Sequence, residues 1–503
     1  MVNRQALNIA ANFSGIGARL VFALAFNVVY FRLLGSEGFG LIGFYTSLAS
    51  LSMLFDLGLG QTAMREVARR DTGYETALGL RSVILTLQFL LGGTGLVLGA
   101  LIALAAPWIA SWFSAQHLTG HEVAVSVRLM GVVLALQFPI NLFYGALIGL
   151  QRQVLSNTLL VATTALRGTI SIAALFGWGA NPAVFFATQI VASAVELAVA
   201  GMTVWRLLPP APTAARFEPG IIRETWRFTS GTWLAVTFAQ VAMLADKLIL
   251  SALLPLHLFG LYSLAATVTA ILQRLAAPFT NAYFPHFVRL VQEGKKEALT
   301  RTYQQASEAA SAIFLAAGLL LVAYAGPVAQ LLSGNHADAL PLGDLIALLA
   351  AANTLNVELA LPFSLLFAHG ITAIALRINL ALCVGYLASL VLLVPHFGVN
   401  AAAGLWLTAN VAMLPALLLM THRAVLRGIA LSWLTRAILM PGCAAAAVLA
   451  AGAAMMPELS KLPMLGWIAV NGMLATAAAL LAAPATRDVA MVIVSRARRQ
   501  NVP

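Results

Sequence analysis

Charged residues are scarce in this chain, and their scarcity excludes an ordinary soluble protein. Asp, Glu, Lys and Arg together make up 9% of the 503 residues, whereas soluble domains carry about 25%. Cysteine is scarcer still, because Cys383 and Cys443 are the only two and both lie in apolar stretches. Isolated thiols of this kind indicate neither a disulfide framework nor a metal site, so we expect them to serve as apolar packing.

Several motifs of other protein classes are also missing. The sequence has no Gly-x-x-x-x-Gly-Lys-Ser/Thr loop, so ATP-driven transport would need a separate subunit. The first apolar stretch is too long for a cleavable signal and lacks a small-residue processing site, so we expect it to remain as the first helix. The predicted external loops are too short to carry the acids and sugar contacts of a membrane enzyme. We therefore expect no enzymatic activity and no cofactor.

The chain is instead dominated by apolar sequence. Hydrophobic residues make up 61% of it, and the mean hydropathy is +0.90. A stretch of about 20 apolar residues is long enough to cross the hydrocarbon core of a membrane. About fourteen such stretches can be drawn, near residues 8–34, 39–64, 82–113, 123–149, 157–177, 182–205, 228–254, 259–287, 307–332, 341–368, 372–394, 399–420, 437–456 and 464–483. The sequence thus predicts an all-α polytopic membrane protein.

The net charge of +11 comes from basic residues that cluster in alternate loops. Arg65, Arg69 and Arg70 lie at the end of the second apolar stretch, for example, and Lys295 and Lys296 follow the eighth. Loops rich in Lys and Arg stay in the cytoplasm, so the alternation predicts that both termini are cytoplasmic. We interpret the basic loops as topology signals and expect no nucleic acid partner.

Two halves of the sequence resemble each other at an offset of roughly 220 residues. The Phe-Gly-Leu motif at 39–41 recurs at 259–261, and the Phe-Gly pair at 176–177 recurs at 397–398. A proline-led segment that begins at Pro139 recurs between these landmarks, from Pro362 onward. Ordered landmarks at nearly one offset indicate an internal duplication.

The duplication predicts a two-lobe architecture. Six helices in each copy return the chain to the same side, so we expect two parallel repeats related by an axis along the membrane normal, a plan used by transporters. The predicted boundaries are 1–207 for an N-terminal lobe, 208–227 for a proline-containing cytoplasmic linker, 228–422 for a C-terminal lobe, and 423–503 for two additional helices and a basic tail.

Three segments resemble a known family. They are the stretch from Tyr30 to Arg70, the stretch Asp246-KLILSALLPLHLFGLYSLA, and the stretch His396-FGVNAAAG. Together they resemble the polysaccharide exporter and O-antigen (Wzx-type) flippase branch of the multidrug/oligosaccharidyl-lipid/polysaccharide (MOP) superfamily. The resemblance implies two six-helix lobes in a V around a central cavity. It also implies alternating access and the export of saccharides linked to polyprenyl (undecaprenyl) pyrophosphate across the bacterial inner membrane.

Arginines at the centres of predicted helices indicate where a substrate binds. An arginine or lysine there costs about 2.5 to 3.5 kcal/mol on insertion scales, so it should face a wet cavity or a partner. Guanidinium groups match phosphate and carboxylate oxygens, which suits pyrophosphate and acidic sugars. The predicted cationic cavity consists of Arg19, Arg274, Arg167, Lys247, Asn12, Asn281 and Gln240. The alternative for each arginine is a structural pairing within or between the lobes.

Four acids in predicted helices are candidates for coupling or gating: Asp56, Glu196, Asp246 and Glu358. A carboxylate that binds and releases a proton or a sodium ion would couple transport to an ion gradient. The alternatives are a structural salt bridge, above all for Asp246, and an anchor for the neighbouring basic loop in the case of Asp56.

Three functions fit a chain of this kind, and we expect the first. It is a flippase for a lipid-linked saccharide, with contacts to membrane lipids and to the polymerase and assembly proteins of surface polysaccharide synthesis. An ion-coupled multidrug exporter of the same superfamily would need an aromatic, acidic pocket, whereas the central charges here are basic. A membrane glycosyltransferase would need a longer external loop.

Overall fold

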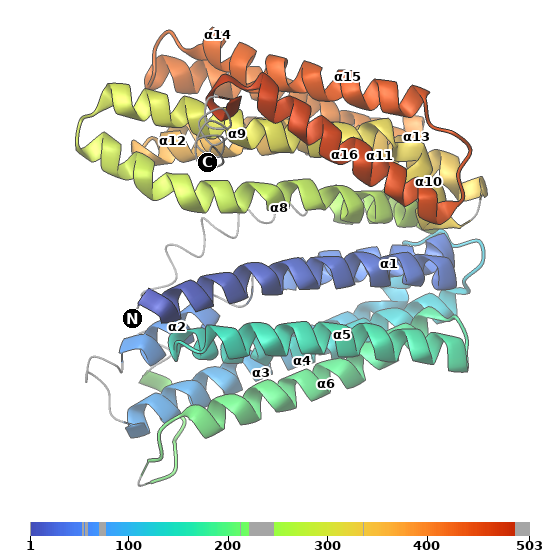
Figure 1. Cartoon of the computed structure of the whole chain (residues 1–503). Coiled ribbons are helices and arrows are strands. Elements are labelled where there is room, and N and C mark those ends of the chain that lie inside the picture. Colours follow the sequence, from blue (N-terminus) through green and yellow to red (C-terminus); the bar gives the residue numbers. More distant parts are fainter. Residues whose placement is uncertain are drawn as a thin grey trace, which may run out of the picture. The chain divides into compact units, whose positions relative to one another are not determined.

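The computed structural model describes residues 2–52, 55, 59–69, 77–211, 213–220, 246–334 and 336–487 of the chain (Figure 1). All regular secondary structure in these ranges is helical, which confirms the all-α prediction. Eleven of the described helices are long and apolar enough to cross a membrane. The chain is therefore a multi-pass membrane protein.

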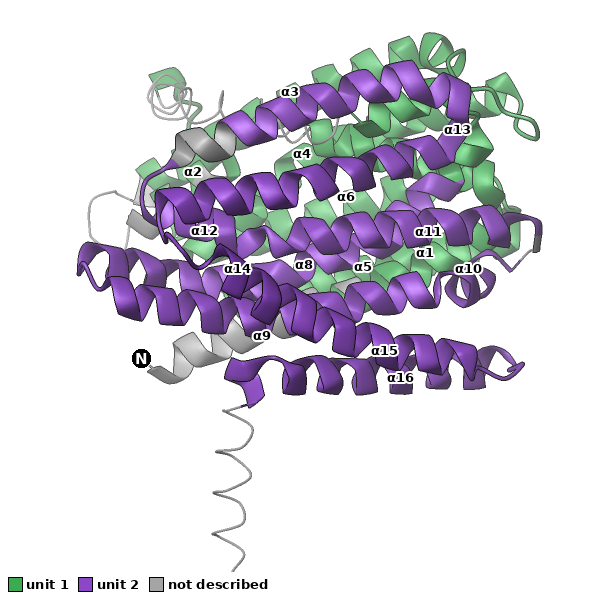
Figure 2. Cartoon of the chain, turned by 90° about the horizontal axis from the view of Figure 1, so that it is seen from above, with its two compact units in different colours: residues 1–260 green, residues 261–503 purple. Residues whose placement is uncertain are grey.

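The chain divides into two compact units, Met1–Gly260 and Leu261–Pro503 (Figure 2). In unit 1, α3 packs against α4, α4 against α6, and α1 against α5. The described helices of unit 1 are α1 (Val2–Ser52), α2 (Leu59–Arg69), α3 (Ala77–Ala110), α4 (Gly120–Gly149), α5 (Gln153–Trp178) and α6 (Pro182–Leu207). The predicted lobe and linker boundaries stay a prediction, since the units are defined by compactness and not by the sequence repeat.

Unit 2 contains most of α8 (Leu256–Gln292), whose first turn belongs to unit 1. Here α9 packs against α11, α15 and α16, and α11 packs against α13. Its remaining described helices are α9 (Lys296–Ala323), α10 (Ala325–Ser333), α11 (His336–Glu358), α12 (Ala360–Ala368), α13 (Thr372–Ala424), α14 (Ala430–Trp433), the π-helical turn η3 (Leu434–Leu439), α15 (Met440–Ala454) and α16 (Lys461–Ala482).

Local sequence explains where several helices begin. Thr119 caps α4, because its hydroxyl accepts from the backbone N–H of Glu122 while the Glu122 carboxylate accepts from the backbone N–H of Thr119. This reciprocal pair is a capping box, which satisfies two backbone donors that the first turn leaves unpaired. Asn181 caps α6 through the N–H of Ala183, and Pro182 occupies the first helical position, where its missing N–H costs nothing.

Two glycines interrupt the longest helices. Gly35 in α1 has φ 70° and ψ −178°, and Gly398 in α13 has φ 73° and ψ −163°. Positive φ is accessible to glycine and costly for other residues. Both glycines lie where the sequence predicts one span to end and the next to begin. The predicted span at 228–254 falls largely outside the described residues, so the count of about fourteen spans stays a prediction.

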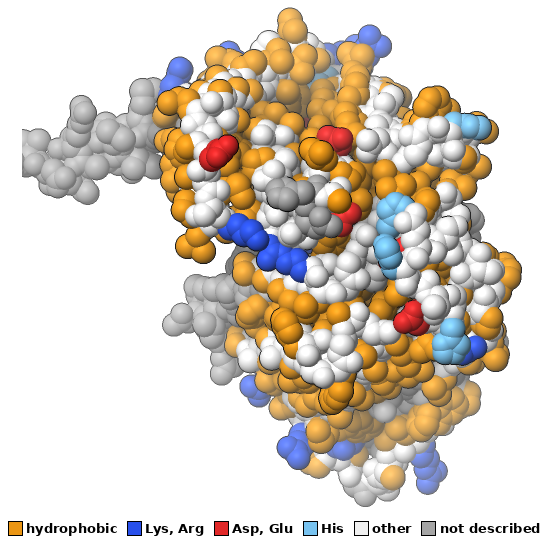
Figure 3. All heavy atoms as spheres, turned by 90° about the vertical axis from the view of Figure 1, so that its right-hand side faces the viewer, with side chains coloured by type: hydrophobic (Ala, Val, Ile, Leu, Met, Phe, Trp, Pro, Cys, Tyr) orange, Lys and Arg blue, Asp and Glu red, His pale blue; other side chains and the backbone are white. Residues whose placement is uncertain are grey.

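The surface of each unit is rich in exposed apolar side chains. Leu104 is 79% exposed, Trp178 is 79% exposed and Leu462 is 82% exposed. The exposure of many large apolar side chains would be unfavourable in water. The exposed apolar side chains along the helices fit a hydrocarbon environment. Figure 3 looks at the ends of the helices, where acidic, basic and histidine side chains lie among the hydrophobic ones.

Glu37 fastens the loop between α3 and α4 to α1. Its side chain is buried, with 4% of the residue exposed. One carboxylate oxygen accepts the backbone N–H of Gln116 at 2.6 Å, and the other accepts those of His117 at 3.0 Å and Leu118 at 2.9 Å. The same loop accepts the N–H of Leu256, at the start of α8, on the carbonyl of Ser114. One carboxylate thus organises the backbone around the kink at Gly35.

Equivalent glycines of the sequence repeat meet next to this loop, within unit 1. A Cβ atom on Gly40 would lie 2.7 Å from the carbonyl oxygen of Leu256, and one on Gly260 would lie 1.8 Å from that of Ser36. Ser36 and Leu256 are themselves related by the offset of the repeat. The contact is reciprocal, and each side leaves no room for a side chain on the other.

Candidate functional site

A buried ion pair lies at the centre of the polar interior of unit 1. Nη2 of Arg167, in the middle of α5, is 2.8 Å from Oε2 of Glu196 on α6, and the two side chains are only 21% and 10% exposed. Nη1 of Arg167 donates to the side-chain oxygen of Gln189 at 2.9 Å. Gln189 and Glu196 are two helical turns apart on one face of α6, which is why a single guanidinium reaches both.

Neutral groups complete the environment of this ion pair. Oε1 of Glu196 accepts the hydroxyls of Tyr144 at 2.9 Å and Thr163 at 3.2 Å. Gln189 in turn donates to Ser171 at 2.8 Å. A buried charge is costly unless it is paired and hydrogen-bonded, and both conditions are met here. The sequence singled out Arg167 and Glu196 separately, and the structure brings them together.

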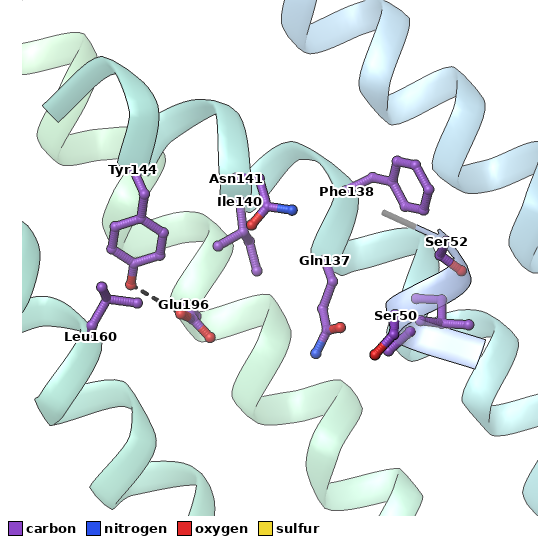
Figure 4. Close-up of a pocket in the computed structure, with 11 residues that line it drawn as sticks. Ser50, Ser52, Gln137, Phe138, Ile140, Asn141, Tyr144, Leu160 and Glu196 are labelled. Carbon is purple, nitrogen blue, oxygen red and sulfur yellow. Dashed lines mark hydrogen bonds between the residues drawn. The ribbon is translucent and has the colours of Figure 1, made fainter. Parts of the chain in front are cut away.

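A cavity of about 280 Å³ opens beside the ion pair. Figure 4 shows Tyr144 pointing to Glu196, with Gln137 and Asn141 on the same helix and Ser50 across from them. The lining therefore carries hydroxyl, amide and carboxylate groups, which suit polar ligands or water. The sequence analysis missed Gln137 and Asn141, although these amides are one turn apart in the apolar second half of α4, and that spacing was the available signal.

A second buried carboxylate lies in unit 2. Glu358 is the last residue of α11, is 3% exposed and accepts the hydroxyl of Ser311 on its Oε2 atom. Its Oε1 atom has no hydrogen-bond partner among the described residues. Ser311 continues a stripe on α9 that includes Tyr303, whose hydroxyl lies 3.4 Å from Nε2 of His422. The span predicted over 341–368 lies within one apolar span of the structure, Ala337–Ala368, in which Leu359 separates α11 from α12.

An amide cluster lies one turn before this break. Asn353 accepts from the indole of Trp406 at 3.0 Å and from Gln273 at 3.3 Å, and it donates to Thr269 at 3.0 Å. Gln273 precedes Arg274 on α8. Arg274 and Asn281 are both exposed and are seven residues apart, so they share one face of the helix as the sequence predicts.

The other predicted site residues are placed as follows. Arg19 is a partly exposed residue of α1, and Asp246 and Lys247 are partly exposed at the start of a described helical segment that precedes α8. Asp56, Gln240 and the side chain of Asn12 lie outside the described residues. Because the two units are described separately, the convergence of Arg19, Arg167 and Arg274 on one cavity stays a prediction.

A metal site is not indicated in the described part of the chain, where no group of three or more His, Cys, Asp or Glu side chains comes together. The described polar side chains can recognise a ligand by hydrogen bonds and charge. They include two buried carboxylates, Glu196 and Glu358, in separate helical units.

Known proteins resemble this chain in sequence and in fold. The sequence model of the family described as "Polysaccharide biosynthesis protein" matches residues 6–291, more than half of the chain. A Shigella flexneri protein described as an O-antigen transporter is 25% identical over 394 residues, which cover 75% of this chain and 87% of that protein.

Two solved transporters have the same fold. A structure of the lipid II flippase MurJ in an inward closed conformation superposes with a TM-score of 0.69 at 10% identity, covering 95% of this chain and 98% of the other. An inward-facing multidrug resistance transporter of the MATE family, from the MOP superfamily, gives a TM-score of 0.65 at 15% identity, covering 81% and 94%. At these identities the likeness concerns the fold.

Proposed function

Since the chain belongs to the polysaccharide biosynthesis protein family, we propose that it is a flippase that moves a saccharide linked to polyprenyl pyrophosphate across the bacterial inner membrane. The family match carries this proposal. It is supported by the similarity to an O-antigen transporter and by a fold shared with a lipid II flippase. The transport would proceed by alternating access, without a catalytic residue or a cofactor.

The placement of the arginines suggests which of them contact the substrate. Arg167 has its charge compensated by Glu196, so we assign this pair to the architecture of the polar interior. Arg274 is exposed, follows Gln273 of the amide cluster in sequence, and shares a face with Asn281. We propose that Arg274 binds the pyrophosphate, because a guanidinium can donate two parallel hydrogen bonds to phosphate oxygens. Arg19 and Lys247, in the other unit, stay predicted ligands.

Glu358 is our preferred coupling residue among the four acids. Its Oε2 atom is held by Ser311, while its Oε1 atom has no partner in the described part of the chain. A buried carboxylate with one uncommitted oxygen can take up a proton or a sodium ion. Glu196 is already occupied by Arg167, Tyr144 and Thr163, which makes it less suited to this role.

The resemblance to polysaccharide exporters supports the direction of transport. The substrate would enter from the cytoplasmic side, where the predicted topology places both termini, and be released outside. Polymerase and assembly proteins of surface polysaccharide synthesis would then receive it, as partners of the chain.

Translocation in proteoliposomes tests the proposal. A labelled polyprenyl-pyrophosphate saccharide is supplied to wild type, Arg274→Ala and Arg274→Lys. As a control we choose Arg301→Ala, which removes another exposed arginine, on α9. We expect Arg274→Ala to lower the rate by about tenfold or more, equivalent to about 1.4 kcal/mol. Arg274→Lys should retain part of it, because lysine keeps the charge but loses the bidentate geometry.

Two results would overturn the proposal in different ways. If wild type moves no lipid-linked saccharide but expels an organic cation down an imposed ion gradient, the chain is a drug exporter. If wild type transports the saccharide and Arg274→Ala transports it equally well, the flippase stands and Arg274 is not a substrate ligand.

A further inference from the structure

A second cavity lies on the outer face of unit 1, between α3, α4 and α6. Its volume is about 570 Å³, within the range of about 300 to 1,000 Å³ that is usual for small-molecule sites. Phe89 on α3 is 63% exposed and Met202 on α6 is 52% exposed at its rim, so the cavity opens away from the bundle. Phe143 and Gly201 line it from within. We call it the α3/α6 groove.

Missing side chains create much of this groove. Gly92 and Gly93 line it from α3, and a Cβ atom built on either would meet no atom within 4 Å. Glycine is unfavourable in the interior of a helix, and close packing does not require it at these two positions. The open volume beside them is therefore available to a ligand that carries small branches.

One end of the groove is polar and cationic. Trp205, which lines the groove, donates its indole N–H to Gln88 at 3.1 Å. The guanidinium of Arg81 lies 5.4 Å from the centre of the Trp205 ring and donates to the carbonyl of Pro209 at 2.8 Å. Within the described residues, Nη1 makes its hydrogen bonds to the backbone. A positive group thus stands at the end of an apolar channel, a complement to a phosphate attached to a hydrocarbon chain.

The segment that follows α6 borders the groove along α3. The backbone N–H groups of Arg216 and Glu218 donate to the hydroxyls of Ser82 at 3.2 Å and Thr86 at 3.0 Å. The two donors are two residues apart in extended chain, which spans about 6.6 Å, and the two acceptors are four residues apart on a helix, which rises about 6.0 Å. The donors and acceptors therefore have matching spacings. Between them the ring of Phe217 packs on Phe89, with centroids 6.4 Å apart. The segment forms a rim beside the groove.

We propose that the α3/α6 groove binds the isoprenoid chain of a polyprenyl phosphate lipid, with the phosphate toward Arg81, at a site distinct from the pyrophosphate site proposed at Arg274. The inference rests on the proposed function, which supplies such a lipid as part of the substrate. Aromatic side chains and the open positions at Gly92 and Gly93 suit a chain with a methyl branch on each repeating unit. A straight acyl chain would leave those positions unfilled. The groove is separate from the polar cavity beside Glu196.

Photolabelling tests the occupant directly. The full chain in nanodiscs is irradiated with a diazirine-bearing polyprenyl monophosphate that carries no sugar, and labelled peptides are mapped by mass spectrometry. Gly92→Leu and Gly93→Leu place side chains at the groove, and the Cβ atom of each meets no atom within 4 Å. The matched control is Gly466→Leu, because a Cβ atom on Gly466, in α16, also meets nothing within 4 Å.

We expect label on peptides that contain residues 88–96 and 197–205. Each groove variant should lower it by about tenfold, equivalent to about 1.4 kcal/mol, while Gly466→Leu keeps the wild-type yield. Thermal unfolding of each variant checks that the fold is intact. The inference is overturned if the groove variants label like wild type, or if a diazirine phosphatidylethanolamine labels the same peptides as efficiently.

Saccharide translocation by the same wild-type preparation separates this inference from the proposed function. Transport without groove labelling overturns the inference alone. Groove labelling that the two leucine variants abolish supports it. Absence of transport by wild type overturns the flippase proposal instead.

Discussion

Replacing Glu37 by glutamine tests the fastening of the loop between α3 and α4. The substitution keeps the size of the side chain but removes its charge and turns one acceptor oxygen into an NH₂ donor. That donor must face either the N–H of Gln116 or those of His117 and Leu118, which the carboxylate now accepts. At least one backbone N–H therefore loses its partner in a buried place.

The magnitude follows from the number of hydrogen bonds affected. A hydrogen bond to a charged group contributes about 1.5 to 3 kcal/mol. Glu37→Gln loses one such bond and weakens two others, so we expect the free energy of unfolding to fall by about 2 to 4 kcal/mol. The lower value applies if the loop shifts and water reaches the unpaired N–H groups.

Unfolding in mixed micelles, followed by tryptophan fluorescence, measures this free energy. Glu293→Gln is the matched control, because Glu293 is exposed in a loop and contacts Lys295 at 2.9 Å and Arg289 at 3.7 Å. Exposed ion pairs of this type contribute little, so the control should unfold like wild type. The reasoning is wrong if Glu37→Gln destabilises the protein no more than Glu293→Gln does.

Two further substitutions test the interior. Arg167→Ala should lower the free energy of unfolding by about 3 to 5 kcal/mol, because it leaves Glu196 buried and uncompensated. Adding Glu196→Ala should recover part of this loss. A double-mutant cycle in mixed micelles measures the coupling, and additive losses would show that the pair is not coupled. Gly260→Ala places a Cβ atom 1.8 Å from the Ser36 carbonyl, so we expect a loss of about 1 to 3 kcal/mol. Gly404→Ala has open space and should unfold like wild type in the same assay, and equal behaviour of the two alanines would contradict the close contact.

The helices and their interruptions were predictable because hydropathy and glycine act locally. The gaps between predicted spans at Gly35 and Gly398 coincide with the non-helical residues of α1 and α13. The interruption between α11 and α12 after Glu358 has a signal in the sequence, because Pro362 has no N–H to donate to the Glu358 carbonyl four residues earlier. The resemblance to polysaccharide flippases is confirmed by the family match.

The site was predictable only as a set of residue types. Arg167 and Glu196 are recognisable as charges in apolar sequence, but their pairing depends on how α5 packs on α6, and the residues between them in sequence carry no signal for that. The contacts of Glu37 could not be predicted from the sequence either, because its partners are backbone groups near residue 117. The α3/α6 groove is harder still, since it arises from side chains that are absent at Gly92 and Gly93.

The reciprocal contact of Gly40 and Gly260 joins equivalent positions of the two sequence repeats. Mutual contacts between equivalent residues are what a twofold homodimer uses, so a duplicated and fused gene can inherit them as an internal interface. At other positions, the sequence of one repeat can change independently of the other. Here a side chain on either glycine would collide with the backbone of the other repeat, so each repeat restricts which residue the other can carry at this position.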